Sequence, residues 1–417
     1  MSHLVIARKY RPASFSSVIG QDHVVVALAR ALLSGRVPHA LLFAGSRGVG
    51  KTSMARLLAR ALNCNANPAR TDSSPSDDSP LIEDDRELIR RAEPCGKCSN
   101  CVDIVRGTSV SVLEIDGASH NSVEDVRDLT SSLRIPPARS SNYKVYIVDE
   151  VHMLSIQAFN ALLKSLEEPP PRTIFVFATT DPQKLPDTVL SRCQRYDFKG
   201  LSDSAIAAQL ERIASGEGIA AEPEVFSLIA RMSHGAMRDA QFLLESLRGF
   251  ATGGPVSIGD VRGLFGLART GFFLELIEAI FARNGASCIA LVDELFSASP
   301  NMRLFVDDMI SYFRAMLFLK LDPNSSKMRE LSSLDPSELS ALELKVRDRT
   351  LSDLQRFFDL VQSSADALLK GYYPRYVLEA LFVKMASMAS LRPLGEILAL
   401  LERELGASKE TLPKKKI

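Results

Sequence analysis

The hydrophobic pattern of the chain changes character near residue 200. Before that point, short apolar runs alternate with segments of helical periodicity, and the runs lie at 41–44, 110–115, 145–148 and 174–178. Strands that alternate with helices form parallel sheets, and such strands are continuously apolar because both faces of the sheet are covered. We therefore expect an α/β domain with a parallel sheet over residues 1–200.

Beyond residue 200 the strand-like runs stop and helical periodicity takes over. Ser202 and Asp203 can start an amphipathic helix that carries Ile206, Leu210 and Ile213 on one face. Further helices are expected at 223–230, 237–248, 272–283, 286–296, 302–320, 351–369 and 375–388, with breaks at 252–255 and Gly266. The pattern predicts a small helical lid at 201–266, an all-helical domain at 267–392 and a C-terminal tail at 393–417, frayed over 413–417.

Length and composition set limits on this picture. A chain of 417 residues is too long for one ordinary core, so two to four domains are expected. Lysine plus arginine and aspartate plus glutamate are both 50, so the formal net charge is zero and any DNA contact must be a local patch. No run of 18 apolar residues and no charged-then-apolar leader is present, so we expect a soluble, unsecreted, cytoplasmic protein with no membrane contact.

A phosphate-binding loop follows the first apolar run. Residues 45–52 fit G-x-x-x-x-G-K-[ST] at every fixed position, between a strand-like segment and a helical one. In such loops the glycines allow a tight turn, backbone N–H groups and the helix N-terminus face the phosphates, the lysine binds the β- and γ-phosphates, and the threonine hydroxyl binds Mg²⁺. The residues expected around ATP here are Gly45, Ser46, Gly48, Val49, Gly50, Lys51, Thr52 and Ser53.

Two acids follow the apolar run at 145–148. Because three of its four residues are β-branched, this run is better read as a buried strand than as a helix, and a strand would deliver Asp149 to its carboxyl end. Asp149 would then hold Mg²⁺ together with Thr52, and Glu150 would orient and activate the attacking water. The alternative is a surface strand that ends in two solvated acids.

Four of the six cysteines have metal-ligand spacing. Cys95, Cys98 and Cys101 form C-x₂-C-x₂-C, and Cys64 lies upstream, at the end of the helix after the phosphate loop. Four thiolates suit a tetrahedral structural Zn²⁺ site, with disulfides and an iron–sulfur cluster as weaker alternatives. The zinc module would span 64–101, with a loop through about residue 80 and a short helix near 81–91. Cys193 and Cys288 are expected to be packed.

Several longer motifs carry a family resemblance: 149–155, 160–164, 178–186, Ser191-Arg192-Cys193, and Arg8 to Pro12 with Gly20-Gln21 near the start. On these residues the chain closely resembles the gamma/tau subunits of the bacterial DNA polymerase III clamp loader, which are AAA+ ATPases. The resemblance is dense from about residue 7 to 246 and includes the four cysteines. It implies an AAA+ domain with a zinc-module insertion, a helical lid and an all-α collar that mediates oligomerisation.

The resemblance also implies roles for single residues. Thr180 is similar to sensor 1, Arg192 to the arginine finger that reaches the ATP of a neighbouring subunit, and Arg238 to sensor 2. His152 is expected to pack or to form a hydrogen bond without a catalytic role. The wall of the adenine pocket would be formed by Arg8, Tyr10, Arg11, Pro12, Val18 and Ile19.

The implied function is that of an ATPase subunit of the clamp loader in the DNA polymerase III holoenzyme, which opens the sliding clamp, loads it onto primed DNA and uses hydrolysis to trigger release. Expected partners are delta- and delta-prime-like subunits and further copies in a hetero-oligomeric ring, the sliding clamp, and primer–template DNA bound without sequence specificity. A helix at 120–134 with Arg127 and Arg134 is a candidate for DNA contact. The chain resembles the short form of the family.

Two other functions stay open. One is another AAA+ machine that remodels DNA, such as a branch-migration helicase, and the cysteine module argues against it. The other is a scaffold subunit that binds nucleotide without hydrolysing it. The presence of Lys51, Thr52, Asp149, Glu150 and Arg192 together argues against a scaffold, which does not need all five.

Overall fold

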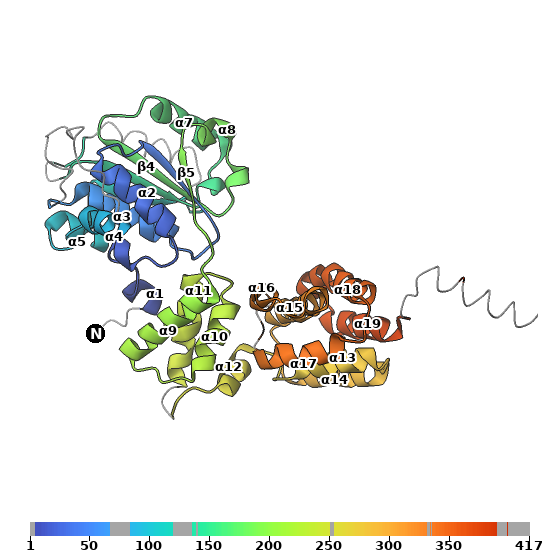
Figure 1. The fold of residues 1–417 in the computed structure, drawn as a ribbon. Helices are drawn as coiled ribbons and strands as arrows, with labels where there is room; N and C mark the ends of the chain where they lie inside the picture. The colour runs from blue at the N-terminus through green and yellow to red at the C-terminus, as the bar shows by residue number, and fades with distance from the viewer. Residues whose placement is uncertain are drawn as a thin grey trace, which may run out of the picture. The chain divides into compact units, whose positions relative to one another are not determined.

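The computed structural model describes residues 5–66, 84–119, 136–138, 141–250, 254–331, 334, 336–389 and 398. The expected DNA-facing helix at 120–134, most of the loop inside the zinc module, and the frayed tail lie outside these residues. The chain divides into two compact units between Ser257 and Ile258 (Figure 1).

The first unit contains a five-stranded parallel sheet in the order β2-β3-β4-β1-β5. The strands are β1 (Ala40–Ala44), β2 (Val112–Asp116), β3 (Lys144–Asp149), β4 (Thr173–Thr179) and β5 (Gln194–Asp197). The prediction of a parallel sheet is confirmed, and its four apolar runs correspond to β1 to β4. The sequence reading missed β5, because in this edge strand only Tyr196 is buried and no apolar run marks it.

Helices cover both faces of the sheet (Figure 1). On one face, α2 (Asp22–Leu33) and α3 (Lys51–Asn63) pack against alternate strand residues such as Phe43. On the other face, α7 (Ile156–Glu167) and α8 (Asp187–Leu190) pack against the intervening residues, such as Tyr146. Each large apolar side chain buried in this way contributes about 1.5–3 kcal/mol, so the central strands are firmly fixed.

The remaining elements of the first unit form its N-terminal segment, the cysteine-containing insertion, the short turns that follow β3 and β4, and the lid. They are α1 (Ile6–Lys9), η1 (Phe15–Ser17), α4 (Asp85–Ala92), α5 (Ser99–Arg106), η3 (Val151–Met153), η4 (Pro182–Lys184), α9 (Asp203–Glu217), α10 (Pro223–Met232), α11 (Met237–Ser246) and η5 (Leu247–Gly249). Ser202 caps α9 as predicted, because its hydroxyl oxygen accepts a hydrogen bond from the N–H of Ala205 at 3.3 Å.

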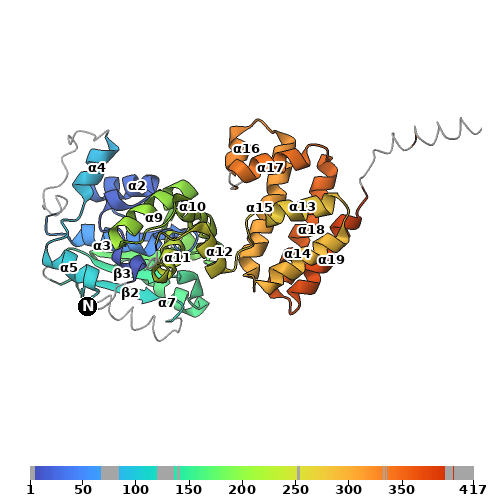
Figure 2. The same ribbon diagram turned by 90° about the horizontal axis from the view of Figure 1, so that it is seen from below.

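The described part of the second unit is helical (Figure 2). Its helices are α12 (Ile258–Phe265), α13 (Phe272–Phe281), α14 (Gly285–Ser297), α15 (Met302–Leu321), α16 (Ser326–Leu331), α17 (Pro336–Val346), α18 (Leu351–Lys370) and α19 (Pro374–Ser387). The sequence reading missed α12, α16 and α17. Of these, α12 and α16 have 8 and 6 residues, too few for a clear periodic signal.

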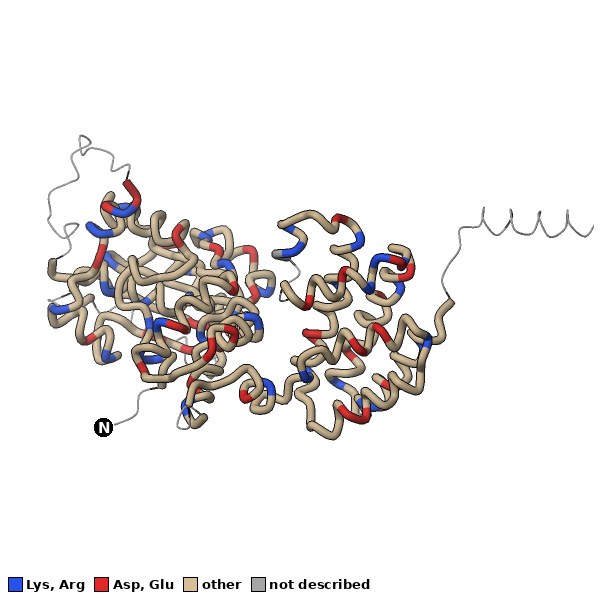
Figure 3. The backbone as a smooth tube through the Cα atoms, turned by 60° about the horizontal axis from the view of Figure 1, so that its bottom comes forward, with Lys and Arg blue, Asp and Glu red and all other residues tan. Residues whose placement is uncertain are grey.

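Charges of both signs are interspersed along the described chain in each unit (Figure 3). This distribution agrees with the zero net charge of the sequence. Among the described residues, no helix combines the length and the apolar character that crossing a membrane requires.

Candidate nucleotide site and cysteine cluster

The loop between β1 and α3 has the backbone conformation that its glycines permit. Gly48 and Gly50 have φ of 79° and 104°, in the left-handed region that other residues avoid. An added Cβ at Gly48 would lie 3.0 Å from the Cβ of Ala236, which precedes the lid helix α11. The loop therefore turns tightly into the start of α3 and lies close to the lid.

Lys51 is held inside this turn. The residue is 5% exposed, and its ammonium donates hydrogen bonds to the carbonyl oxygens of Gly45 at 2.7 Å and Ser46 at 2.8 Å. Burial lowers the pKa of Lys51, whereas the nearby charges of Glu150 and Asp149 raise it. A buried ammonium at the N-terminus of a helix favours an anionic partner, so the loop fits a phosphate group.

Asp149 and Thr52 meet at the carboxyl end of β3. The Thr52 hydroxyl donates a hydrogen bond to the carboxylate of Asp149 at 2.6 Å. A hydroxyl and a carboxylate side by side, next to a phosphate-binding loop, are the oxygen ligands that Mg²⁺ uses in such sites. The donor set therefore fits Mg²⁺.

Glu150 is the centre of a small polar network. Its backbone is left-handed, with φ of 43°, which costs about 1 kcal/mol or more and is typical of functional sites. One carboxylate oxygen accepts hydrogen bonds from the Thr180 hydroxyl at 3.0 Å and from the Thr180 N–H at 3.3 Å. The His152 ring nitrogen Nδ1 lies 3.4 Å from the same oxygen and 3.0 Å from the hydroxyl of Thr179. Because β3 and β4 are neighbours, residues 30 positions apart meet here.

Arginines gather near the same loop. The pKa of Arg11 is lowered, first because protein atoms around it displace water and second because of the positive charge of Arg56. Arg238 and Arg8 have smaller effects, and much of the side chain is nevertheless exposed. Arg56 also forms a double hydrogen bond to Glu114 at 2.7 and 2.6 Å. This concentration of positive charge suits a polyanion. The sequence reading missed Arg56, whose signal is its position one helical turn after Thr52.

The other expected wall and lid residues have these positions. The Tyr10 hydroxyl donates a hydrogen bond to Glu217 of α9 at 2.9 Å, and Val18 packs against the core that contains α2 and α3. Arg8, Pro12 and Ile19 lie in the same N-terminal segment. The Arg238 N–H donates a hydrogen bond to the carbonyl oxygen of Gly48 at 3.4 Å, so the start of α11 contacts the phosphate loop.

Arg192 lies at a different edge of the sheet. Its guanidinium contacts Glu167, the last residue of α7, at 2.7 Å and donates to the Thr188 carbonyl oxygen at 2.7 Å. It is two residues before β5, so it lies where that strand begins, whereas the phosphate loop follows the end of β1. Because β1 and β5 run parallel, Arg192 and the phosphate loop lie at opposite ends of the strands. The length of β1 separates them, about 16 Å at roughly 3.3 Å per residue.

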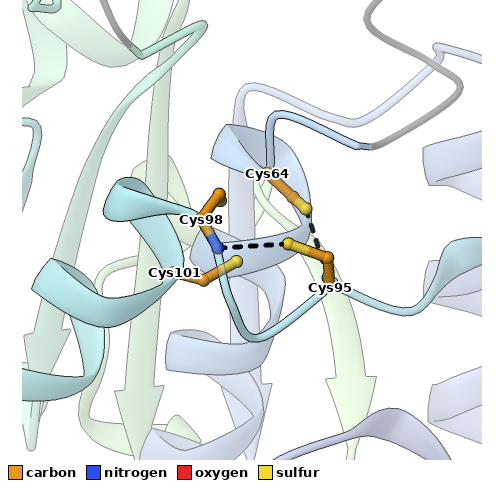
Figure 4. Close-up of side chains that lie close together, drawn as sticks. All are labelled: Cys64, Cys95, Cys98 and Cys101. Carbon is orange, nitrogen blue, oxygen red and sulfur yellow. Dashed lines mark hydrogen bonds between the residues drawn. The ribbon is translucent and has the colours of Figure 1, made fainter.

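The four expected metal ligands converge (Figure 4). The sulfur atoms of Cys64, Cys95, Cys98 and Cys101 all lie within 4.8 Å of one another. A tetrahedral Zn²⁺ with Zn–S bonds of about 2.3 Å needs sulfurs about 3.8 Å apart, so a single zinc ion fits. A four-iron cluster is larger and needs sulfurs farther apart.

The environments of the four sulfurs differ. Hydrogen bonds from the backbone N–H groups of Lys97 and Cys98 lower the pKa of Cys95 to about 6. Burial, followed by the hydrogen bond with Cys98, raises the pKa of Cys101 to about 12. Burial also raises the pKa of Cys193 to about 12 and raises that of Cys288, in keeping with packed thiols.

Three family models match consecutive parts of the chain. The DNA polymerase III delta subunit model matches residues 20–87 and 84–202, the clamp loader ATPase lid domain model matches 205–245, and the model of domain III of DNA polymerase III subunits gamma and tau matches 256–401. Together they cover the sheet, the lid helices and the helical second unit.

Curated relatives match over most of the chain. DNA polymerase III subunit tau of Escherichia coli strain K12 is 41% identical over 86% of this chain and 51% of its own length. The tau subunit of Bacillus subtilis strain 168 is 35% identical over 92% of this chain and 63% of its own length. Subunit gamma of Buchnera aphidicola is 34% identical over 78% of this chain and 81% of its own length.

Among solved structures, the Thermotoga maritima RuvB branch migration motor aligns with 65% of this chain and 79% of its own, at a TM-score of 0.43 and 19% identity. That likeness is too remote to favour the branch-migration alternative. The chain spans about half the length of the Escherichia coli relative. Nearly all residues of the chain itself align in order with gamma/tau relatives. The chain therefore belongs to the family of DNA polymerase III subunits gamma and tau, AAA+ proteins of the clamp loader.

Proposed function

We propose that this chain is an ATP-hydrolysing subunit of a bacterial replicative clamp loader, which loads a sliding clamp onto primed DNA. The observation that carries the proposal is the convergence of Lys51, Thr52, Asp149, Glu150 and Thr180 at the carboxyl ends of three neighbouring strands. Ligands of open α/β sheets bind at this edge. Membership of the gamma/tau family supplies the context in which such a site would work.

Nucleotide binding would use groups that already point toward one another. Lys51 would exchange its bonds to the Gly45 and Ser46 carbonyls for the β- and γ-phosphates, while Thr52 and Asp149 hold Mg²⁺. When bound, Mg²⁺ would neutralise charge on the phosphates. Arg238, beside Gly48, would close the lid over the nucleotide. The remaining loop positions and the N-terminal wall would contribute backbone N–H groups and apolar contacts.

Hydrolysis would depend on Glu150 and Thr180. Glu150 would accept a hydrogen bond from the attacking water and orient it toward the γ-phosphate. The Thr180 hydroxyl, 3.0 Å from the Glu150 carboxylate, is close enough to pass between that carboxylate and a phosphate oxygen. It would thereby link the arrival of nucleotide to the position of Glu150.

Arg192 would act on a neighbouring subunit. It lies at the edge where strands begin, about 16 Å from the phosphate loop of its own chain, and an arginine side chain cannot span that distance. It therefore has to serve the nucleotide of another subunit or none at all. Arginine fingers supplied in trans raise phosphoryl-transfer rates by roughly 10³–10⁵.

We further propose that Cys64, Cys95, Cys98 and Cys101 hold a structural Zn²⁺, which supplies rigidity and no chemistry. The proposed partners are delta- and delta-prime-like subunits and other copies of this chain in a ring, with the clamp and primer–template DNA as substrates. DNA would be bound through its phosphates without base specificity. The protein would act in the cytoplasm.

The test is ATP hydrolysis by the purified chain, first alone, then with the candidate partner subunits, then with clamp, and finally with primed DNA. Activity that rises sharply only when all are present supports a clamp loader with catalysis at subunit interfaces. Binding without hydrolysis in every combination would instead identify a scaffold. Stimulation by DNA that is indifferent to clamp would identify another DNA-remodelling ATPase.

A further inference from the structure

The N-terminal segment at 6–17, which we call the strap, is fixed to the lid at its first end. The Ile6 N–H donates a hydrogen bond to Glu245 of α11. Lys9 and the Tyr10 hydroxyl both contact Glu217 of α9, at 2.5 and 2.9 Å. The side chain of Glu217 is only 8% exposed, so this end of the strap is held by a largely buried carboxylate.

The other end of the strap is fixed by the cysteine-containing insertion. The two carboxylate oxygens of Glu93 accept hydrogen bonds from the N–H groups of Phe15 at 2.9 Å and Ser16 at 2.7 Å. These are the first N–H groups of η1, which have no partner within that helix. Arg60 of α3 adds a hydrogen bond to the carbonyl oxygen of Ala13 at 2.9 Å.

Glu93 connects the strap directly to the cysteine cluster. It directly follows α4 and is two residues before Cys95, whose own N–H donates to the sulfur of Cys64 at 3.2 Å. A Cβ added at Gly96 would lie 3.5 Å from the guanidinium of Arg60, so the turn between Cys95 and Cys98 also borders the strap's second anchor. The cluster, Glu93 and Arg60 thus form one contiguous body at the second end of the strap.

Between the two anchors the strap approaches the phosphate loop. The charges of Arg56 and Arg238 act on Arg11. Arg238 donates its N–H to the carbonyl oxygen of Gly48 at 3.4 Å, and Arg56 lies one helical turn after Thr52. Residues Arg8 to Pro12 are also the proposed wall of the adenine pocket. The position of that wall is therefore set by the lid at one end and by the insertion at the other.

We propose that the cysteine-containing insertion serves as a brace for the nucleotide pocket, with Glu93 as the positioning residue that transmits its rigidity to the strap. This inference rests on the proposed nucleotide site. Binding requires the wall residues to be ordered, and ordering costs conformational entropy. An anchored strap is already ordered before nucleotide arrives, so less conformational entropy is lost on binding. Nucleotide therefore binds more tightly than it would to a strap that is free at one end.

The experiment compares Glu93→Ala and Glu93→Gln with the matched control Glu87→Ala. Glu87 lies on the same helix, but its carboxylate pairs with the exposed side chains of Arg90 and Arg91 and not with the strap. The full chain is titrated with the fluorescent nucleotide MANT-ADP. Zinc content is measured by elemental analysis, and amide hydrogen exchange is followed at Phe15 and Ser16.

The brace predicts a graded result at unchanged zinc content. Glu93→Ala weakens MANT-ADP binding about tenfold or more, because it removes two charge-assisted hydrogen bonds. Glu93→Gln, which keeps one acceptor oxygen, weakens it about threefold, and both variants exchange the amides of Phe15 and Ser16 faster than wild type. The Glu87→Ala control binds as wild type does. A general loss of stability would not produce this order.

The proposed brace would be overturned if Glu93→Gln bound MANT-ADP as tightly as wild type while the amide of Phe15 exchanged its hydrogen faster. Should Glu93→Ala fail to fold, the Glu93→Gln affinity decides alone. The proposed function has a separate failure: wild-type protein that contains zinc but does not bind MANT-ADP would remove the nucleotide site itself.

Discussion

Replacement of Thr180 by valine tests the link between the phosphate site and Glu150. Valine has nearly the same shape as threonine but lacks the hydroxyl that donates to the Glu150 carboxylate at 3.0 Å. The backbone N–H of Thr180, at 3.3 Å, remains. The substitution therefore removes one specific bond and leaves the fold of β4 intact.

The structure sets the size of the effect. Hydrogen bonds to charged groups contribute about 1.5–3 kcal/mol. The Glu150 side chain is 29% exposed, so water competes for it and the lower figure applies. A loss of about 1.5 kcal/mol in the transition state corresponds to a roughly tenfold lower rate. Affinity for MANT-ADP should change little, because Lys51 and Thr52 are untouched and ADP has no γ-phosphate for the hydroxyl to contact.

The assay is single-turnover ATP hydrolysis in the assembled complex with clamp and primed DNA, together with MANT-ADP titration. Thr180→Ser, which keeps a hydroxyl, is the matched control and should retain most of the rate. A Thr180→Val protein that hydrolyses ATP at the wild-type rate would refute the role of the hydroxyl. Parallel losses of affinity and rate would show that Thr180 acts in binding instead.

Three further predictions concern other parts of the molecule. Arg192→Ala should lower the rate of ATP hydrolysis in the assembled complex by about 10³-fold. The free energy of unfolding of the isolated chain should hardly change, because the exposed ion pair with Glu167 contributes about 1 kcal/mol or less. An unchanged rate in the complex would exclude a finger. After chelation of zinc at pH 7.5, iodoacetamide should modify Cys95 well before Cys101. The reason is that a pKa of about 6 leaves Cys95 mostly thiolate, whereas a pKa of about 12 keeps Cys101 protonated. Peptide mass spectrometry measures the order of modification, and the reverse order would contradict these environments. Phe175→Ala should lower the free energy of unfolding of the first unit by about 3–5 kcal/mol, because the ring is fully buried between Tyr146 and Phe177. Urea unfolding measures this free energy. A loss below about 1 kcal/mol would mean that this face of the sheet repacks.

Much of the site could be predicted from sequence because its residues occur in short, fixed motifs. The turn at Gly48 and Gly50 is local, so the spacing of the glycines and Lys51 was enough to predict it. The four cysteines were predicted on the same basis, and their sulfurs do converge. The roles assigned to Thr180, Arg192 and Arg238 came from family resemblance and stay predictions.

Contacts between distant segments could not be predicted in the same way. Nothing around Glu93 indicates that its carboxylate accepts hydrogen bonds from Phe15 and Ser16, because the bond depends on how α4 packs against η1. The edge strand β5 was missed because its sequence is mostly polar and its partner β1 lies about 150 residues earlier. Periodicity describes one element at a time and carries no information about which elements meet.

The opposite positions of Arg192 and the phosphate loop have a consequence for symmetry. A contact that joins one edge of a subunit to the other edge of the next is head-to-tail, so the two partners use different surfaces. Such contacts cannot form a closed two-fold dimer; they extend into an arc or close into a ring. In an open arc built from this chain alone, the number of completed nucleotide sites is one fewer than the number of copies. If Arg192 is the proposed finger, a partner that caps an end of the arc would decide whether the terminal site receives one.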